Sequence, residues 1–131
     1  AQSVNNPVYY VQYAFARCCS LFRQAGLRGI EIEGIFDCDL SYLKDPLEIE
    51  LMIALEDFPD ILRNAFINRA PHRLTSYLES LAKSFHSFYN SLRILQEERQ
   101  LMYARMALVF ATQQVIKNGL DILGVSAPES M

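Results

Sequence analysis

One periodic apolar run constrains the fold more than any other feature of the sequence. From residue 74 to residue 92, a large apolar side chain returns at every third or fourth position, as Leu74, Leu78, Leu81, Phe85, Phe88 and Leu92. This spacing places all six on one side of an α-helix, whereas the faces of a strand alternate with a period of two. The run therefore predicts a long amphipathic helix that buries this side in a core.

A first helix is predicted to begin at Pro7 and to stop at Gly26. Proline suits the first helical position, and glycine commonly ends a helix. The apolar side of this helix is predicted to comprise Val8, Val11, Phe15, Cys18, Phe22 and Ala25. We interpret Cys18 and the adjacent Cys19 as small buried hydrophobes.

A further helix is predicted to begin at Asp45, which can cap it, with Glu48 at the capping-box position. Its apolar side is predicted to comprise Leu47, Leu51, Leu55 and Phe58. Pro59 should break or kink this helix. The apolar pattern then continues in a new direction through Ile61, Leu62, Ala65 and Phe66.

The last helix is predicted to start near Glu97 or Glu98 and to stop at Gly124. One side of it carries Leu101, Ala104, Leu108, Ala111, Val115, Gly119 and Ile122. Residues 26–45 have no sustained period, and we expect a loop there with a short helical turn near residues 40–43. Together these patterns predict an all-α bundle of four to five helices.

Length and charge limit the classes of protein to which this chain can belong. Its 131 residues fit one domain, and no apolar stretch approaches the roughly 20 residues that a membrane span needs. The first six residues have neither a basic flank nor an apolar core, so we expect no secretion signal and a cytoplasmic location. The net charge of −3 argues against a non-specific nucleic-acid binder, but it allows a specific RNA reader with a local basic patch.

Metal binding and catalysis are not expected in this chain. It has three cysteines and two histidines, and their spacing does not match a metal site or a disulfide framework. We interpret His86 as a surface histidine on the polar side of its helix. Asp37 and Asp39 form a carboxylate pair, but no nucleophile, glycine-rich phosphate loop or metal-ligand spacing accompanies them.

A second stripe on the first helix carries chemistry that burial alone does not explain. Tyr10, Tyr13 and Arg17 recur at helical spacing on the side away from the apolar residues. Tyrosine and arginine suit stacking on unpaired bases. The alternative is that the tyrosines pack on another helix or on another domain, and spacing alone does not decide between the two.

Two basic residues of the last helix are candidates for phosphate contacts. Arg105 and Lys117 could bind the backbone of a nucleic acid. The alternative is a solvated helix face on which the lysine stabilises the C-terminal end of the helix dipole.

Two segments of the sequence resemble the C-terminal domain of arginyl-tRNA synthetases. Residues 6–17 read Asn-Pro-Val-Tyr-Tyr-Val-Gln-Tyr-Ala-Phe-Ala-Arg, which is similar to the Asn-Pro-Val-x-Tyr-Val-Gln-Tyr-Ala-His-Ala-Arg of that family. Residues 104–131 end in Leu-Gly-Val-Ser-Ala-Pro-Glu-Ser-Met, which also resembles the family. The sequence departs from the family pattern at Phe15, which replaces a histidine, at Arg93, which replaces an aromatic, and at Ser130, which replaces an arginine.

The resemblance implies an all-α anticodon-binding fold of the DALR type over residues 1–131. It implies a parent class I enzyme that ligates arginine to its tRNA with ATP and magnesium, which a separate catalytic domain would hold. The fragment alone would have no catalytic centre and no cofactor, and we expect a monomer. The anticodon-loop contacts of the family, which prefers cytosine at the middle anticodon position, correspond here to Tyr10, Tyr13, Arg17, Tyr89 and Met131.

Three other interpretations compete with this resemblance. The same domain type occurs in cysteinyl synthetases and in the β chain of glycyl synthetases, but the ending at residues 124–131 argues against both. A helical protein-interaction module would use the Tyr10–Tyr13–Arg17 stripe on a protein groove. A freestanding enzyme is disfavoured because no catalytic constellation is present.

Overall fold

The computed structural model describes residues 6–131, and this part of the chain is entirely helical. It contains five α-helices, α1 (Pro7–Leu27), α2 (Pro46–Glu56), α3 (Phe58–Ile67), α4 (Pro71–Ser91) and α5 (Arg99–Leu123), and two short 3-10 helices, η1 (Ile32–Asp37) and η2 (Leu40–Tyr42). The prediction of an all-α bundle of four to five helices is confirmed. Our interpretation of the N-terminal residues rests mainly on positions 1–5, which lie outside the described residues.

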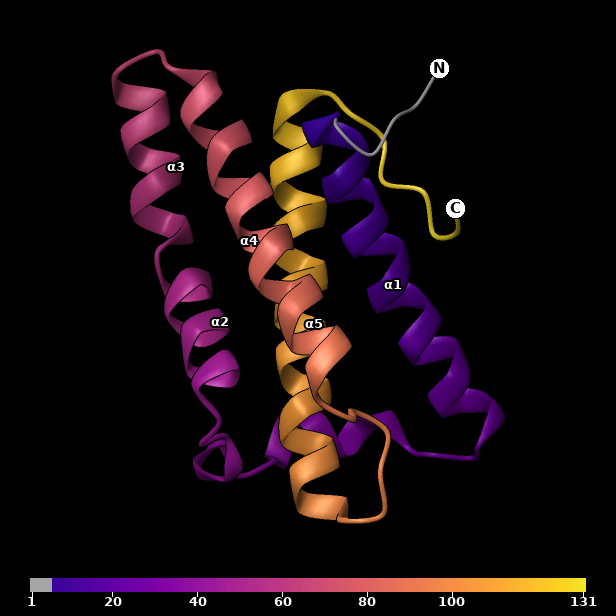
Figure 1. Cartoon of the computed structure of the whole chain (residues 1–131). Coiled ribbons are helices and arrows are strands. Elements are labelled where there is room, and N and C mark those ends of the chain that lie inside the picture. The colour runs from indigo at the N-terminus through magenta and orange to yellow at the C-terminus, as the bar shows by residue number, and fades with distance from the viewer. Residues whose placement is uncertain (1–5) are drawn as a thin grey trace.

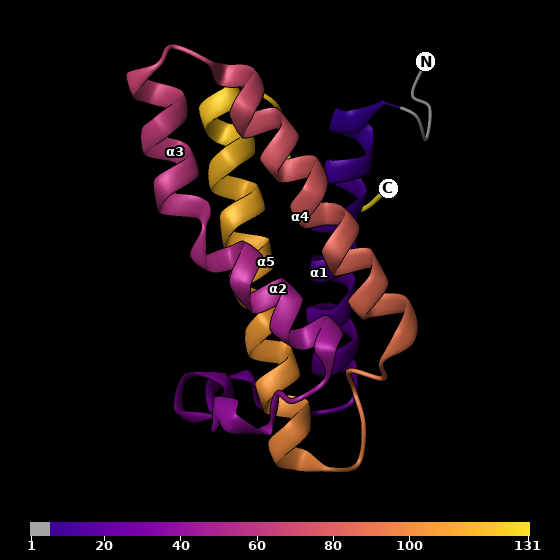
Figure 2. The same ribbon diagram turned by 60° about the vertical axis from the view of Figure 1, so that its left-hand side comes forward.

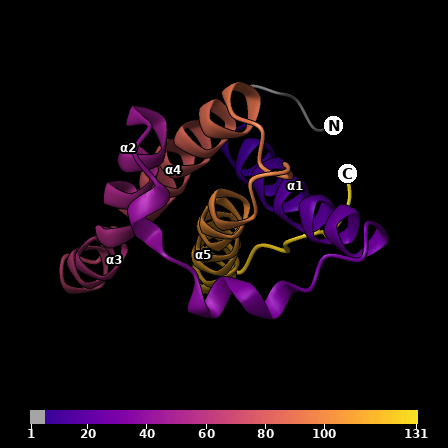
Figure 3. The same cartoon turned by 90° about the horizontal axis from the view of Figure 1, so that it is seen from below.

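Helices α4 and α5 form the middle of the bundle (Figure 1). Helix α1 packs against both of them on one side, and α2 packs against both on the other. Figure 2 shows α2 and α3 as consecutive segments joined at a bend, with α3 continuing along α4. Seen from below, η1 and η2 run past one side of α5 on the way from α1 to α2 (Figure 3).

The ends of α2 and α5 follow the capping signals in the sequence, whereas α1 continues past its predicted stop at Gly26 to Leu27. Asp45 accepts a hydrogen bond from the backbone N–H of Leu47, and Glu48 accepts one from the backbone N–H of Asp45, so the predicted capping box is present. Helix α5 begins at Arg99, close to the predicted start, and the Glu98 side chain caps it by accepting from the backbone N–H groups of Gln100 and Leu101. Gly124 ends α5 with a φ of 73°, a left-handed conformation that suits glycine.

The core confirms the apolar run that predicted α4. Five of its six side chains are buried and Leu92 is half-buried. Two other assignments are wrong, because Phe66 is 82% exposed and Ile122 is 55% exposed. Helix α5 has neighbours on several sides, so its buried surface is much wider than the predicted stripe and includes Met102, Tyr103, Met106, Val109, Thr112, Ile116 and Leu120.

Residues 26–45 agree only in part with the predicted loop, whereas Cys18 and Cys19 lie in the predicted environment. The helical turn near residues 40–43 is present as η2, whereas the six-residue η1 was not predicted. Cys18 and Cys19 are buried, as predicted, and burial raises the pKa of the Cys18 thiol.

Within residues 6–131, every helix is too short or too polar to span a membrane. In the same part of the chain, no group of three or more His, Cys, Asp or Glu side chains could hold a metal ion.

Candidate nucleic-acid interface

The predicted stripe on α1 lies where α1 contacts the second half of α4. Tyr10, Tyr13 and Arg17 follow one another at spacings of three and four, so they point to the same side of α1. Helix α4 adds three side chains at the same kind of spacing, namely His86, Tyr89 and Asn90. We refer to these six residues as the α1–α4 cluster.

The stripe is less exposed than the sequence suggested. Tyr13 is 39% exposed, while Tyr10 and Arg17 are half-buried. The Tyr10 ring packs on the core and lies 4.7 Å from the ring of His86, between centroids. The tyrosines therefore pack in part on another helix, as one of the two interpretations expected, and still leave an open surface.

Arg17 is held in one orientation by four side chains. Its NH1 group lies 3.1 Å from Nδ1 of His86 and donates to Oδ1 of Asn90 at 3.3 Å. Its Cζ lies 4.7 Å from the centroid of the Tyr13 ring and 4.3 Å from that of Tyr89. Both distances are typical of cation–π contacts, so the guanidinium is clamped between two aromatic rings.

The positive charge of Arg17 has no carboxylate partner among the described residues. The three salt bridges in this part of the chain join Arg63 to Asp60, Arg105 to Glu48 and Lys117 to Asp121. The acceptors that face Arg17 are an imidazole and an amide oxygen, and the Tyr13 hydroxyl lies 3.4 Å from its NH2 group. The cluster therefore presents a fixed cation whose charge remains available to an anion.

His86 is buried, with only 8% of its surface exposed, so the prediction of a surface histidine is wrong. Helix α1 covers this part of α4, and the ring of Tyr13 lies 5.6 Å from the imidazole. Arginine cannot accept a hydrogen bond, so the imidazole nitrogen facing Arg17 must accept one and the ring must be neutral. Desolvation, assisted by the nearby Arg17 charge, lowers the pKa of His86 to about 4, and a backbone contact with Tyr10 acts weakly in the opposite direction.

Two hollows open on either side of Arg17. One, of about 270 Å³, is lined by Tyr9, Tyr10, Tyr13, Arg17, His86 and Asn90. The other, of about 250 Å³, is lined by Tyr13, Ala16, Arg17, Ser20, Arg23, Tyr89, Ser130 and Met131. Neither of these linings contains an aspartate or a glutamate, so the surface is locally basic within a chain of net charge −3.

The C-terminal tail brings Met131 to this surface. Gln12 donates to the carbonyl of Ser126 at 2.8 Å, and Arg23 donates to the carbonyl of Glu129 at 3.2 Å. The tail therefore runs back along α1, as Figure 1 shows at the end marked C. The five residues predicted for the anticodon loop, Tyr10, Tyr13, Arg17, Tyr89 and Met131, thus gather on one surface.

The two candidate phosphate contacts lie elsewhere, in different environments. Arg105 is largely buried and pairs through its Nε with Glu48 at 2.6 Å, so its position conflicts with the role of a free phosphate ligand. A nearly buried carboxylate already neutralises its charge. Lys117 is exposed and pairs with Asp121, four residues further along α5, at 2.9 Å. Its phosphate contact stays a prediction.

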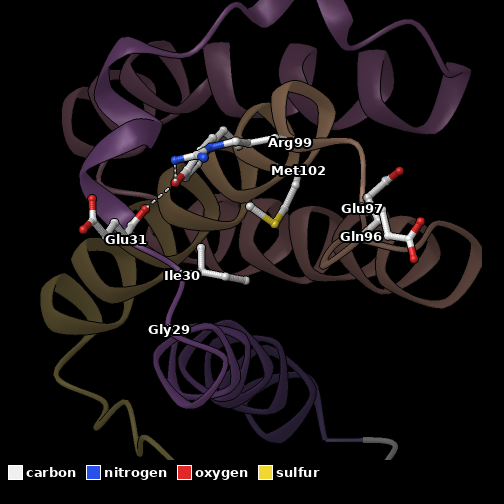
Figure 4. A pocket seen from close by; sticks show the side chains of 8 residues that line it. Gly29, Ile30, Glu31, Gln96, Glu97, Arg99 and Met102 are labelled. Carbon is white, nitrogen blue, oxygen red and sulfur yellow. Dashed lines mark hydrogen bonds between the residues drawn. The ribbon is translucent and has the colours of Figure 1, made fainter.

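A larger hollow, of about 470 Å³, lies between the start of α5 and the loop that follows α1 (Figure 4). Its lining includes two acidic residues, Glu31 and Glu97, and one basic residue, Arg99. The Tyr103 hydroxyl donates to the carbonyl of Glu31 at 2.8 Å and anchors this loop on α5. Two carboxylates make the hollow a poor surface for a nucleic-acid backbone, so it does not compete with the α1–α4 cluster.

A helical bundle that carries aromatic rings around an arginine without a carboxylate partner among the described residues suits an RNA-binding domain. The sequence comparison agrees, because a profile of the DALR anticodon binding domain matches residues 11–131. The chain belongs to this family.

Proteins named as arginine–tRNA ligases are similar in sequence to this chain. The chain is 49% identical over 130 residues to an arginine–tRNA ligase of Acetivibrio thermocellus and 50% identical over 130 residues to one of Caldanaerobacter subterraneus. Each alignment covers 99% of this chain and 23% of the relative, so the chain spans about a quarter of their length.

Two solved structures share the fold. The arginyl-tRNA synthetase of Thermus thermophilus superposes with a TM-score of 0.83 at 36% identity, and that of Plasmodium falciparum with 0.82 at 26%. Each match covers 98% of this chain and 22% of the other.

Proposed function

We propose that this chain is the anticodon-binding part of an arginine–tRNA ligase and that its α1–α4 cluster, with Met131, contacts the anticodon loop of arginine tRNA. One observation carries the proposal for the site. The Arg17 guanidinium is fixed between the rings of Tyr13 and Tyr89 and has no carboxylate partner among the described residues. The relatives at 49% and 50% identity, named as arginine–tRNA ligases, support the choice of tRNA.

Each residue of the site has a role that its chemistry suits. Anticodon bases are unpaired, so they can turn outward, stack on aromatic rings and be read along their edges. Tyr10 and Tyr13 line the hollow on one side of Arg17, and Tyr89 and Met131 line the hollow on the other. The remaining N–H groups of Arg17 suit a base edge or a phosphate.

The chemistry of ligation belongs to another part of the proposed enzyme. A catalytic domain outside this chain would hold arginine, ATP and magnesium, and this chain would supply no group to the reacting atoms. The proposed enzyme would act in the cytoplasm, where tRNA is charged, as a monomer. Purified by itself, the chain should therefore show no arginine-dependent exchange between pyrophosphate and ATP.

The proposal is tested in the full-length ligase with Tyr13→Ala and Arg17→Ala. Each change should weaken arginylation of the wild-type tRNA by about 1–3 kcal/mol in transition-state terms, the scale of one lost base stack. The cost should be much smaller on a tRNA whose middle anticodon base is already wrong, because the contact is then already lost.

Tyr42→Ala provides the matched control. Tyr42 is 41% exposed, close to the 39% of Tyr13, but it lies in η2, away from the cluster. This variant should arginylate both tRNAs as the unchanged enzyme does. If Tyr13→Ala and Arg17→Ala leave arginylation unchanged while the fold persists, the site is not an RNA surface and a protein-binding role becomes the better explanation.

A further inference from the structure

The orientation of Arg17 depends on α4 as much as on its own helix. An arginine side chain is long, and it loses considerable rotamer freedom when it is held in one place. Here two acceptors on α4, Nδ1 of His86 and Oδ1 of Asn90, face the same NH1 group at 3.1 Å and 3.3 Å. The side chain is therefore ordered before any ligand arrives.

We propose that His86 is a positioning residue of the anticodon site, which acts as a neutral hydrogen-bond acceptor to hold Arg17 between the rings of Tyr13 and Tyr89. The inference rests on the function proposed above and adds a residue that does not itself reach the RNA. A binding site that is ordered in advance loses less conformational entropy when the ligand binds. His86 would thereby strengthen the contact that Arg17 makes.

The neutrality of His86 is central to this role. A carboxylate at the same place would hold the guanidinium more firmly, but it would also cancel the charge that attracts a phosphate. A protonated imidazole would repel Arg17 and could not accept its hydrogen bond. Burial and the neighbouring Arg17 both favour the neutral ring by lowering the pKa of His86 to about 4.

The surroundings of His86 allow a positioning role to be distinguished from a packing role. The Nε2 atom of His86 is buried without a well-formed hydrogen bond, and the backbone contact with Tyr10 does not complete one, which disfavours the folded state. A leucine at this position would remove that unpaired group and keep an apolar body in contact with Tyr10. Packing alone therefore predicts that His86→Leu is harmless, whereas positioning predicts that it weakens RNA binding.

The test compares His86→Leu with His86→Asn in the full-length ligase. Binding of an RNA hairpin with the arginine anticodon is measured by fluorescence anisotropy, and unfolding is followed for each variant. His86→Leu should bind roughly 5–10-fold more weakly while its melting temperature stays equal or rises, since tenfold corresponds to about 1.4 kcal/mol. Asparagine carries its oxygen on the same γ branch as Nδ1, so His86→Asn should restore binding to within about twofold.

Two further variants show whether the effect passes through Arg17. In an Arg17→Ala background, His86→Leu should cause no additional loss of binding, because there is no guanidinium left to hold. His72→Leu is the matched control, since His72 is the other histidine of the chain and lies exposed at the opposite end of α4. It should bind the hairpin as the unchanged protein does.

The possible failures are distinguishable. If Arg17→Ala weakens binding and His86→Leu does not, the positioning role is wrong while the RNA site stands. An equal loss from His86→Leu with and without Arg17 also overturns it, because the histidine then acts directly or through the fold. If neither Arg17→Ala nor His86→Leu changes binding, the proposed function itself fails.

Discussion

Nε of Arg105 lies 2.6 Å from Oε2 of Glu48, and this ion pair joins α5 to the first turn of α2. Glu48 is 1% exposed and uses its other oxygen to accept the backbone N–H of Asp45 in the capping box. The guanidinium also donates to the carbonyl of Arg93 at 2.8 Å, in the connection before α5. Arg105 thus links α5 both to the distant helix α2 and to the connection that precedes α5.

Arg105→Met should destabilise the chain by about 3–5 kcal/mol, because it leaves the Glu48 carboxylate buried without its counter-charge. The measurement is the free energy of unfolding in urea. Lys117→Met is the control, since it breaks an exposed pair with Asp121 and should cost at most about 1 kcal/mol. Equal losses from the two changes would show that the Arg105 pair is not effectively buried.

Shortening the buried side chains at the centre of α4 should strongly destabilise the chain. Leu81 and Phe85 are both 0% exposed, so Leu81→Ala and Phe85→Ala should each destabilise the chain by about 2–5 kcal/mol. Phe66→Ala serves as the control, because a side chain that is 82% exposed should change stability by about 0.5 kcal/mol or less. A urea midpoint that both core changes leave in place would contradict the assignment of this side of α4 to the core.

Two glycines should respond to alanine in opposite directions. A Cβ at Gly34 would lie 2.7 Å from Cζ of Tyr103, whose hydroxyl already anchors the loop through Glu31, so Gly34→Ala should cost about 1–3 kcal/mol. Gly26 lies in α1 with nothing within 4 Å of its Cβ position, so Gly26→Ala should stabilise by about 0.5–1 kcal/mol. Thermal unfolding measures both, and a stable Gly34→Ala variant would mean that the Tyr103 ring can move aside.

The sequence predicts the helices well because their signals are local. Asp45 and Glu48 form their capping box within one turn, and Gly124 ends α5 through its own backbone conformation. The position of Ile122 was predicted wrongly because burial depends on neighbours. This residue lies in the last turn of α5, where 55% of its surface stays exposed although it shares the helical period of the buried residues.

In the site, too, the features set by nearby residues could be predicted from the sequence, whereas those set by packing between helices could not. The spacing of Tyr10, Tyr13 and Arg17 is visible within α1 alone, and the resemblance to a known family added Tyr89 and Met131. The role of His86 depends on the packing of α1 against α4, 69 residues apart at the Arg17–His86 contact. No pattern within α4 marks that histidine as buried, although its distance of three residues from Tyr89 places the two on one side.

The depressed pKa of His86 makes stability depend on pH in a defined direction. The folded state keeps the imidazole neutral down to about pH 4, whereas the unfolded chain takes up a proton below about pH 6.5. The contribution of the neutral ring is therefore fully present above the unfolded pKa, and it is lost as the pH falls from about 6.5 towards 4. Partial exposure of the neighbouring Arg17 lets solvent weaken the effect, so we expect a loss of about 1 kcal/mol between pH 7 and pH 5.

His86→Leu provides the reference for this measurement. All other groups are common to both proteins, so the difference between their urea unfolding curves isolates His86. Relative to His86→Leu, the unchanged chain should become about 1 kcal/mol less stable when the pH is lowered from about 7 to about 5. If the two proteins lose stability in parallel, His86 has an ordinary pKa in the folded state. If the unchanged chain instead gains stability relative to the variant, the folded imidazole is charged, and it cannot accept the hydrogen bond of Arg17.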